Sequence, residues 1–191
     1  YKCALGFAPV NPSLAVTNTV VTVPIGLVSG MGDTLTPPYL HATPYYSSLV
    51  PADGLKFHYK LDTVATHMNL VGLGPVNPVI FERSLKIMNG FFGQFLNGSR
   101  AGLEPILGVD GLSETHLASL DRQTVVPQAW SDGELRVGGQ TRVSVSAEAG
   151  FAGLIIASSV ASPTATSVGS LLLDPSSAVP LAETLIVGNR L

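Results

Sequence analysis

The stretch Val21-Thr-Val-Pro-Ile-Gly-Leu-Val-Ser-Gly-Met-Gly-Asp33 is an apolar run that ends in an acidic residue. A second run, Leu55-Lys-Phe-His-Tyr-Lys-Leu61, leads through a short loop to His67. Short apolar runs bounded by turn residues are typical of buried parallel strands. Sites in open α/β sheets are built at the carboxyl ends of such strands. The two runs therefore predict an α/β fold in which Asp33 and His67 share one edge of a sheet.

The first hundred residues alternate strand-like and helix-like segments. Strands are predicted at residues 4–8, 20–29 and 55–61. A helix is predicted over about 39–49, because Pro37-Pro38 is tolerated in a first helical turn. Asn77-Pro78 provides an N-cap and first turn for a long helix that Gly98 closes. Residues 1–100 are therefore predicted to form one domain with part of a parallel sheet.

The second half differs in composition: it is rich in Ser, Thr, Val and Leu and contains frequent turn residues. A short helix is expected near 113–120, followed by turns at Asp132-Gly133 and Gly138-Gly139. Strand patterns recur at 142–147, 154–158, 170–173 and 184–187. Residues 101–191 are therefore predicted to form a linker and a small antiparallel, β-sandwich-like module.

Composition limits the classes of partner. The 191 residues are 46% hydrophobic and 12% charged, with a net charge of −3. The absence of a basic run argues against nucleic acid or anionic lipid as the main partner. No apolar run approaches the ~20 residues of a membrane-spanning helix. The low charge suits a secreted protein, Cys3 is expected to be a free thiol, and Tyr1 suggests a processed or partial chain.

Asp33 and His67 carry the chemistry that the sequence suggests. A carboxylate can hold an imidazole in one tautomer and stabilise it when protonated, and the imidazole can then shuttle a proton for a nucleophile. Each residue alone also has an ordinary reading: Asp33 could cap its own turn, and His67 could be a surface histidine. Their agreement in spacing and in position at strand ends favours an acid–histidine pair.

The nucleophile is not evident in this sequence. The acid precedes the histidine, which excludes the chymotrypsin order but permits a subtilisin-like order with a downstream serine. Ser99, Ser159 and Ser170 do not stand in contexts that resemble a nucleophile at a helix start. The Gly-x-Ser-x-Gly motif of α/β-hydrolases does not occur, so in such an enzyme the serine would lie upstream of Tyr1 or on a second chain.

Other candidates favour structural roles. His41, His58 and His116 lack metal-ligand spacing, so neither a metal nor another cofactor is expected. His58, in a strand beside Tyr59, is expected to be structural, and His41 is expected on the exposed side of a helix. Trp130 could stack on a ligand, although a lone tryptophan before a turn more often packs between modules.

Residues 1–97 resemble the C-terminal half of an α/β-hydrolase of the dienelactone-hydrolase and bacterial cutinase or polyester-hydrolase type. The resemblance rests on Lys2-Cys-Ala-Leu-Gly-Phe-Ala-Pro9, Val23–Gly30 with Asp33-Thr34, His41–Leu49 and Thr66-His67. It implies that Asp33 and His67 are the acid and base of a catalytic triad. It also places the serine and the oxyanion-hole amides in a segment upstream.

The same resemblance assigns two substrate-binding positions. Leu35 matches a position that lines the acyl pocket of the family, although it could also be simple core packing. Val10 stands where polyester hydrolases usually carry an aromatic residue, which favours aliphatic or small esters. The second half loosely resembles β-rich C-terminal modules of secreted bacterial proteins, and this likeness implies no activity.

Two functions from different classes follow. The first is a secreted serine-type ester hydrolase acting on an ester substrate, with this chain supplying Asp33 and His67. The second is a non-catalytic secreted structural or self-assembling module, such as a filament or coat subunit. The hydrolase predicts a parallel sheet around the pair, whereas the structural module predicts a mostly antiparallel one.

Overall fold

The computed structural model describes residues 2–11, 19–52, 54–74, 76–99, 101–125, 128–133 and 141–146. It also describes four strands as paired backbone, at residues 152–157, 163–166, 169–172 and 179–185. The chain divides into two compact units, residues 1–147 and residues 148–190. The site lies in the first unit.

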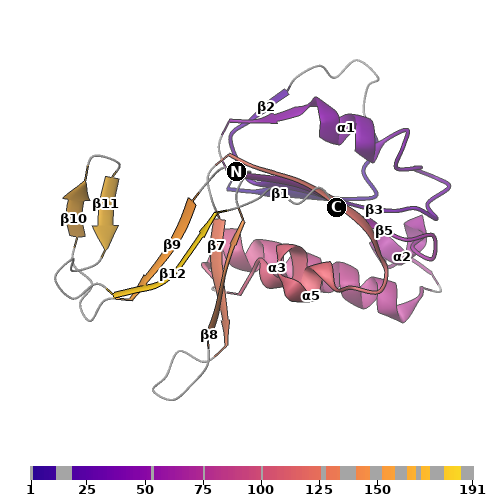
Figure 1. The fold of residues 1–191 in the computed structure, drawn as a ribbon. Helices are drawn as coiled ribbons and strands as arrows, with labels where there is room; N and C mark the ends of the chain where they lie inside the picture. Colours follow the sequence, from indigo (N-terminus) through magenta and orange to yellow (C-terminus); the bar gives the residue numbers. More distant parts are fainter. Residues whose placement is uncertain are drawn as a thin grey trace. The chain divides into compact units, whose positions relative to one another are not determined.

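A four-stranded sheet forms the centre of the first unit (Figure 1). Its strands are β1 (Ala4–Phe7), β3 (Ile25–Gly30), β5 (Leu55–Leu61) and β6 (Leu117–Thr124), in the order β1-β3-β5-β6. The first three run parallel, and β6 pairs antiparallel with β5. A separate parallel pair joins β2 (Thr19–Val21) to β4 (Leu49–Pro51). The expected α/β class with a mainly parallel sheet is therefore confirmed.

Helices flank this sheet on both sides (Figure 1). Helix α1 (Ala42–Ser48) lies on one side, and α3 (Pro78–Asn97) with the short α4 (Glu104–Leu107) and α5 (Val109–Leu112) lies on the other. Helix α3 begins as its sequence predicts, because the Asn77 side chain accepts a hydrogen bond from the Val79 amide. It ends at Gly98, whose φ of 66° is a conformation that glycine adopts without strain.

The core lies between β5 and α3. Every second residue of β5 packs into the core cluster on the α3 side, and Phe57 meets Phe91 with ring centroids 5.7 Å apart. Ile80 and Ile87 join them from α3, all fully buried. Burying side chains of this size stabilises a fold by roughly 2–3 kcal/mol each, which makes this contact the main support of the unit.

The alternate residues of β5 face α1 and are polar. The Lys56 Nζ donates to the carbonyl oxygens of Leu49 (2.7 Å) and Tyr46 (3.2 Å), at the C-terminal end of α1. It also lies 4.2 Å from the centroid of the Tyr46 ring. The cation thus adds hydrogen bonds to carbonyls at the end of the helix, where positive charge is favourable.

The remaining strands pair antiparallel. Strand β7 (Gln128–Gly133) pairs with β8 (Thr141–Ser146) in the first unit. In the second unit, β9 (Ala152–Ala157) pairs with β12 (Val179–Leu185), and β10 (Pro163–Thr166) with β11 (Gly169–Leu172). The expected antiparallel strands are therefore present, and the β-sandwich arrangement stays a prediction. The predicted turn at Gly138-Gly139 lies outside the described residues.

Four sequence expectations differ from the structure. The predicted turn at Asp132-Gly133 is wrong, because both residues belong to β7 and pair with β8. The predicted helix at 113–120 is wrong, because residues from Leu117 onward form β6 against β5. The expected strand at 20–29 is two strands, β2 and β3, separated around Pro24. The predicted boundary at residue 100 also differs, since β6 completes the sheet and the first unit extends to residue 147.

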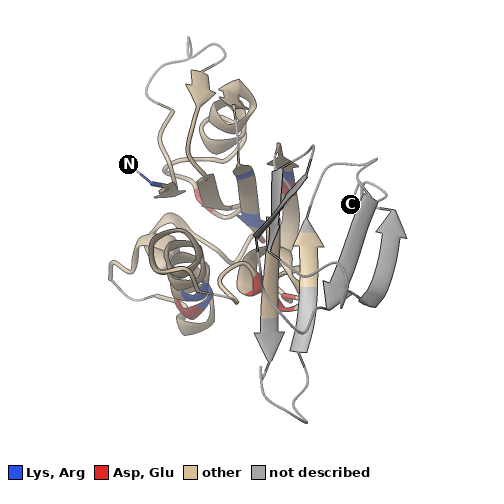
Figure 2. Cartoon of the chain, turned by 90° about the vertical axis from the view of Figure 1, so that its left-hand side faces the viewer, with Lys and Arg blue, Asp and Glu red and all other residues tan. Residues whose placement is uncertain are grey.

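Charged residues are sparse in the described part of the chain. Figure 2 shows Lys and Arg on several separate elements, and α3 carries one acidic residue, Glu82, beside the basic Arg83 and Lys86. The Lys86 Nζ and Glu82 Oε1 atoms of that helix are 3.3 Å apart. Among the described residues, no helix is long and apolar enough to cross a membrane.

Candidate active site

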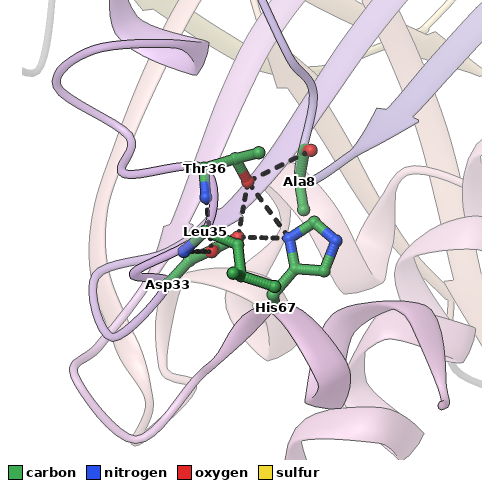
Figure 3. Close-up of polar contacts among 5 residues, drawn as sticks. All are labelled: Ala8, Asp33, Leu35, Thr36 and His67. Atoms are coloured by element: carbon green, nitrogen blue, oxygen red, sulfur yellow. Dashed lines mark hydrogen bonds and ion pairs between the residues drawn. The ribbon is translucent and has the colours of Figure 1, made fainter.

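Asp33 and His67 meet at the carboxyl edge of the parallel strands. Asp33 follows β3, and His67 begins α2 (His67–Val71) after the loop that leaves β5. The His67 Nδ1 atom lies 2.9 Å from the Asp33 Oδ2 atom (Figure 3). The Asp33 side chain is fully buried, whereas 25% of the His67 side chain is exposed. A buried acid thus holds a histidine that reaches the surface.

The Asp33 carboxylate is held by its own turn as well as by His67. Its Oδ1 atom accepts hydrogen bonds from the backbone amides of Leu35 (2.9 Å) and Thr36 (2.8 Å). Its Oδ2 atom accepts one from the Thr36 hydroxyl (2.7 Å). The turn-capping and histidine-binding interpretations of Asp33 are therefore not alternatives, because one carboxylate does both.

These contacts keep Asp33 ionised. Burial by itself would raise the pKa of the Asp33 carboxyl, but the hydrogen bonds from the Thr36 amide, the Thr36 hydroxyl and His67 outweigh it. The pKa of Asp33 therefore lies below its ordinary value, and the group is an anion at neutral pH.

The carboxylate determines which nitrogen of His67 carries a proton. Because Oδ2 accepts from Nδ1, the Nδ1–H tautomer is the one that fits this contact, and Nε2 is left as the basic nitrogen. Among the described residues, no hydrogen bond to Nε2 occurs. The imidazole can therefore take a proton at Nε2 while Asp33 stabilises the resulting cation.

Two glycines allow the His67 loop to approach β3 closely. A Cβ atom on Gly30 would lie 2.0 Å from the Ala65 carbonyl oxygen, and one on Gly32 would lie 2.1 Å from the Thr63 carbonyl oxygen. The Gly32 amide also donates to the Ala65 carbonyl at 3.2 Å. Glycine at these positions thus permits the backbone contact that brings His67 to Asp33.

A second Asp–His pair lies at the same edge. The His116 Nδ1 atom is 2.9 Å from the Asp62 Oδ2 atom, which joins the end of β5 to the start of β6. The Asp62 side chain is 34% exposed, in contrast to the buried Asp33. Burial raises and the His116 contact lowers the pKa of Asp62, with a net lowering. This pair is not among the residues that the sequence predicts, and its signal is an acid directly after one strand and a histidine directly before the next.

The predicted substrate-binding residues lie at the surface. Leu35 is 67% exposed and Val10 is 59% exposed, so the core-packing alternative for Leu35 is wrong. Leu35 contributes its backbone amide to Asp33, and its side chain remains available to solvent or a ligand. His41, directly before α1, accepts from the Asn11 amide at 3.3 Å and is not part of the pair.

Trp130 has a structural contact. It is 5% exposed, and its Nε1 atom donates to the Glu104 Oε2 atom at 2.7 Å. The Glu104 residue is also buried. A tryptophan whose indole N–H is occupied within the core is not placed to stack on a ligand, which favours the packing interpretation.

A serine–histidine contact lies inside the fold. The Ser29 Oγ atom is 2.7 Å from the His58 Nε2 atom, across β3 and β5, and both residues are buried. The His58 Nδ1 atom is buried without a hydrogen bond in the described residues. Burial, helped by the positive charge of Lys60 and opposed by Asp121, lowers the pKa of His58 from 6.5 to about 4. Because both side chains are buried, the contact favours the structural role that the sequence predicts for His58.

His58 should make the fold less stable in mild acid. The unfolded chain binds a proton on this histidine below pH 6.5, whereas the folded chain stays neutral there down to about pH 4. Stability therefore falls as the pH drops through this window, by about 3 kcal/mol in all. Urea unfolding at pH 7 and pH 4 should show this loss in the wild type and much less of it in His58→Gln. An equal loss in both proteins would contradict the assignment.

Apart from the Asp33–His67 pair, the described residues form a surface hollow but no metal centre. Among the described residues, no group of three or more His, Cys, Asp or Glu side chains could hold a metal ion. A surface hollow of about 390 Å³ is lined by Arg83, Lys86, Pro105, Asp110, Ser113, Glu114 and Thr115. Its basic and acidic groups include an ion pair between Arg83 Nε and Glu114 Oε2 at 3.4 Å, so the hollow favours no ligand of one charge.

Comparison of the sequence with known proteins identifies no family for this chain. No protein-family model matches the chain, and no curated protein is significantly similar to it.

Proposed function

We propose that this chain supplies the acid and the base of a serine-type carboxylic ester hydrolase. The observation that carries the proposal is the 2.9 Å contact between a buried, ionised Asp33 and the Nδ1 atom of a partly exposed His67. This arrangement orients an imidazole and stabilises its protonated form, which is what an acid–histidine pair does in acyl transfer. The nucleophilic serine would come from an upstream segment or from a second chain, as the resemblance implies.

The roles of the two residues follow from this geometry. His67 Nε2 would accept the proton of the serine as the serine attacks the ester carbonyl, and would then return it to the leaving alcohol. Asp33 would hold the ring and offset its positive charge in both steps. The order of acid after β3 and histidine after β5, on parallel neighbouring strands, supports an α/β-hydrolase of the dienelactone-hydrolase or cutinase type.

The surroundings support an apolar substrate. Leu35 lies within the turn of Asp33 and is 67% exposed, and Met68 directly follows His67 and is 43% exposed. Exposed apolar side chains beside a catalytic group favour esters with an aliphatic acyl chain. The secreted location that the composition suggests would give such an enzyme access to extracellular esters.

The rival proposal, a self-assembling structural module, has less support. It predicts a mostly antiparallel sheet around Asp33 and His67, whereas β1, β3 and β5 run parallel there. The antiparallel pairs of the second unit agree with either function, because a catalytic domain can carry such a module.

Fluorophosphonate labelling tests the hydrolase proposal. The probe reacts with an activated serine, so the purified protein and every co-purifying chain are treated and read by intact mass. We expect one adduct, on a serine of an upstream segment or of a second chain, and no adduct after His67→Gln. A sample that forms no adduct and hydrolyses no ester would overturn the proposal.

A further inference from the structure

The Thr36 hydroxyl lies among three polar groups of the site (Figure 3). Its Oγ1 atom is 2.7 Å from Asp33 Oδ2, 3.2 Å from His67 Nδ1 and 3.3 Å from the Ala8 carbonyl oxygen. The residue is only 7% exposed. The backbone amides of Leu35 and Thr36 already bind Asp33 Oδ1, so the Thr36 hydroxyl adds a contact to the other carboxylate oxygen, Oδ2.

The Thr36 hydroxyl can donate one hydrogen bond and accept another at the same time. A threonine hydroxyl has one proton to donate and two lone pairs to accept with. The shorter contact, to an ionised carboxylate, is the stronger use of the proton, because charge-assisted hydrogen bonds are shorter and stronger than neutral ones. The Oγ1 lone pairs then face His67 Nδ1–H, which lies within reach of both Asp33 Oδ2 and Thr36 Oγ1.

The Thr36 side chain also lies beside the end of β1, with its Oγ1 atom 3.3 Å from the Ala8 carbonyl oxygen. Ala8 follows β1, has a φ of 44° and is buried, and its amide donates to the Val28 carbonyl at 2.8 Å. A non-glycine residue in the left-handed region is strained, and such residues often occur at functional sites. The Ala8 carbonyl points toward Thr36, so the ends of β1, β3 and β5 meet at this hydroxyl.

We propose that Thr36 is a positioning residue, whose hydroxyl aligns the Asp33 carboxylate with His67 Nδ1–H and so keeps the imidazole in one tautomer. This inference rests on the proposed hydrolase function. The residue acts through Asp33 and His67 and need not touch a substrate.

An NMR titration of this chain tests the role without any turnover. Thr36→Val removes the hydroxyl and keeps the shape, Thr36→Ala removes both, and Thr36→Ser keeps the hydroxyl. Loss of the donor should shift the Asp33 pKa upward in the Val and Ala variants, with the wild-type value restored in Ser. The ring nitrogen signals of His67 should show one tautomer in wild type and Ser, and a mixture in Val and Ala.

The second Asp–His pair is an internal control. Asp62 and His116 make the same kind of contact without Thr36, so the pKa of Asp62 should be unchanged in every Thr36 variant. In an ester-hydrolysing preparation, Thr36→Val should lower kcat about tenfold with little change in KM, as expected for one lost hydrogen bond in the transition state.

Two results would overturn the inference. An Asp33 pKa and a His67 tautomer that are unchanged in both Thr36→Val and Thr36→Ala would show that the hydroxyl does not position the pair. A Thr36→Ser variant that behaves like Val would show that the methyl group matters instead. Because the titration needs no nucleophile, its outcome is separate from that of the fluorophosphonate experiment.

Discussion

Asp33→Asn is expected to lower the rate of ester hydrolysis by about 10⁴-fold, with the fold intact. The amide can still occupy the turn, but it no longer carries the charge that stabilises protonated His67. Its NH₂ group also favours the tautomer in which Nδ1 accepts, which places a proton on Nε2 where the base should be. Steady-state hydrolysis of a short-chain ester by the preparation that contains the nucleophile measures this effect.

Asp62→Asn is the matched control. It makes the same chemical change in an Asp–His pair of the same 2.9 Å length, at the same edge of the sheet. We expect kcat to stay within about twofold of wild type, because Asp62 is not in contact with His67 in the described structure. Equal rate losses in the two variants, or near-wild-type activity in Asp33→Asn, would show that Asp33 is not the catalytic acid.

Gly30→Ala is expected to destabilise the fold by about 3 kcal/mol and to separate His67 from Asp33. The added Cβ atom would lie 2.0 Å from the Ala65 carbonyl oxygen and 2.8 Å from the Ala65 Cβ atom. Backbone atoms cannot rotate away as a side chain does, so the loop before His67 must move. Urea unfolding gives the stability loss, and the His67 ring signals report whether the contact with Asp33 survives.

Gly6→Ala controls for the general cost of a methyl group in a strand. A Cβ atom on Gly6 would make ordinary contacts, with Leu27 at 3.5 Å and Pro9 at 3.6 Å as its nearest neighbours. This variant should retain the stability and the His67 signals of the wild type. If Gly30→Ala were equally harmless, the close approach of β3 and the His67 loop would not be what positions the histidine.

Local sequence signals predicted much of the first unit. Strand β5 lies at the predicted residues, Leu55–Leu61, directly after the turn residues Pro51-Ala-Asp-Gly54. Helix α3 begins at Pro78 after Asn77 and ends before Gly98, since capping chemistry is local. Asp33 and His67 were predicted to share an edge from the ends of their strands, and the structure places them in contact.

What the sequence did not reveal depends on long-range contacts. Residues 117–124 form a strand because they pair with the edge of β5. The local sequence Leu-Ala-Ser-Leu-Asp-Arg-Gln-Thr has no pattern that predicts this pairing. The Asp62–His116 pair exists only because β6 returns beside β5. The Thr36 hydroxyl meets His67 across 31 residues, so its role is invisible before the loops are placed.

The four hydrogen bonds on the Asp33 carboxylate differ in how far along the chain their partners lie. Three come from residues two or three positions away, and the fourth comes from His67, 34 positions away. Ordering a short turn requires little chain entropy, whereas holding His67 requires the whole excursion through α1 and β5 to be closed. Local opening of β5 would therefore break the contact of His67 with Asp33, whereas the Asp33 carboxylate would keep the three hydrogen bonds of its own turn. His67 is thus the residue of the pair whose position is lost more easily.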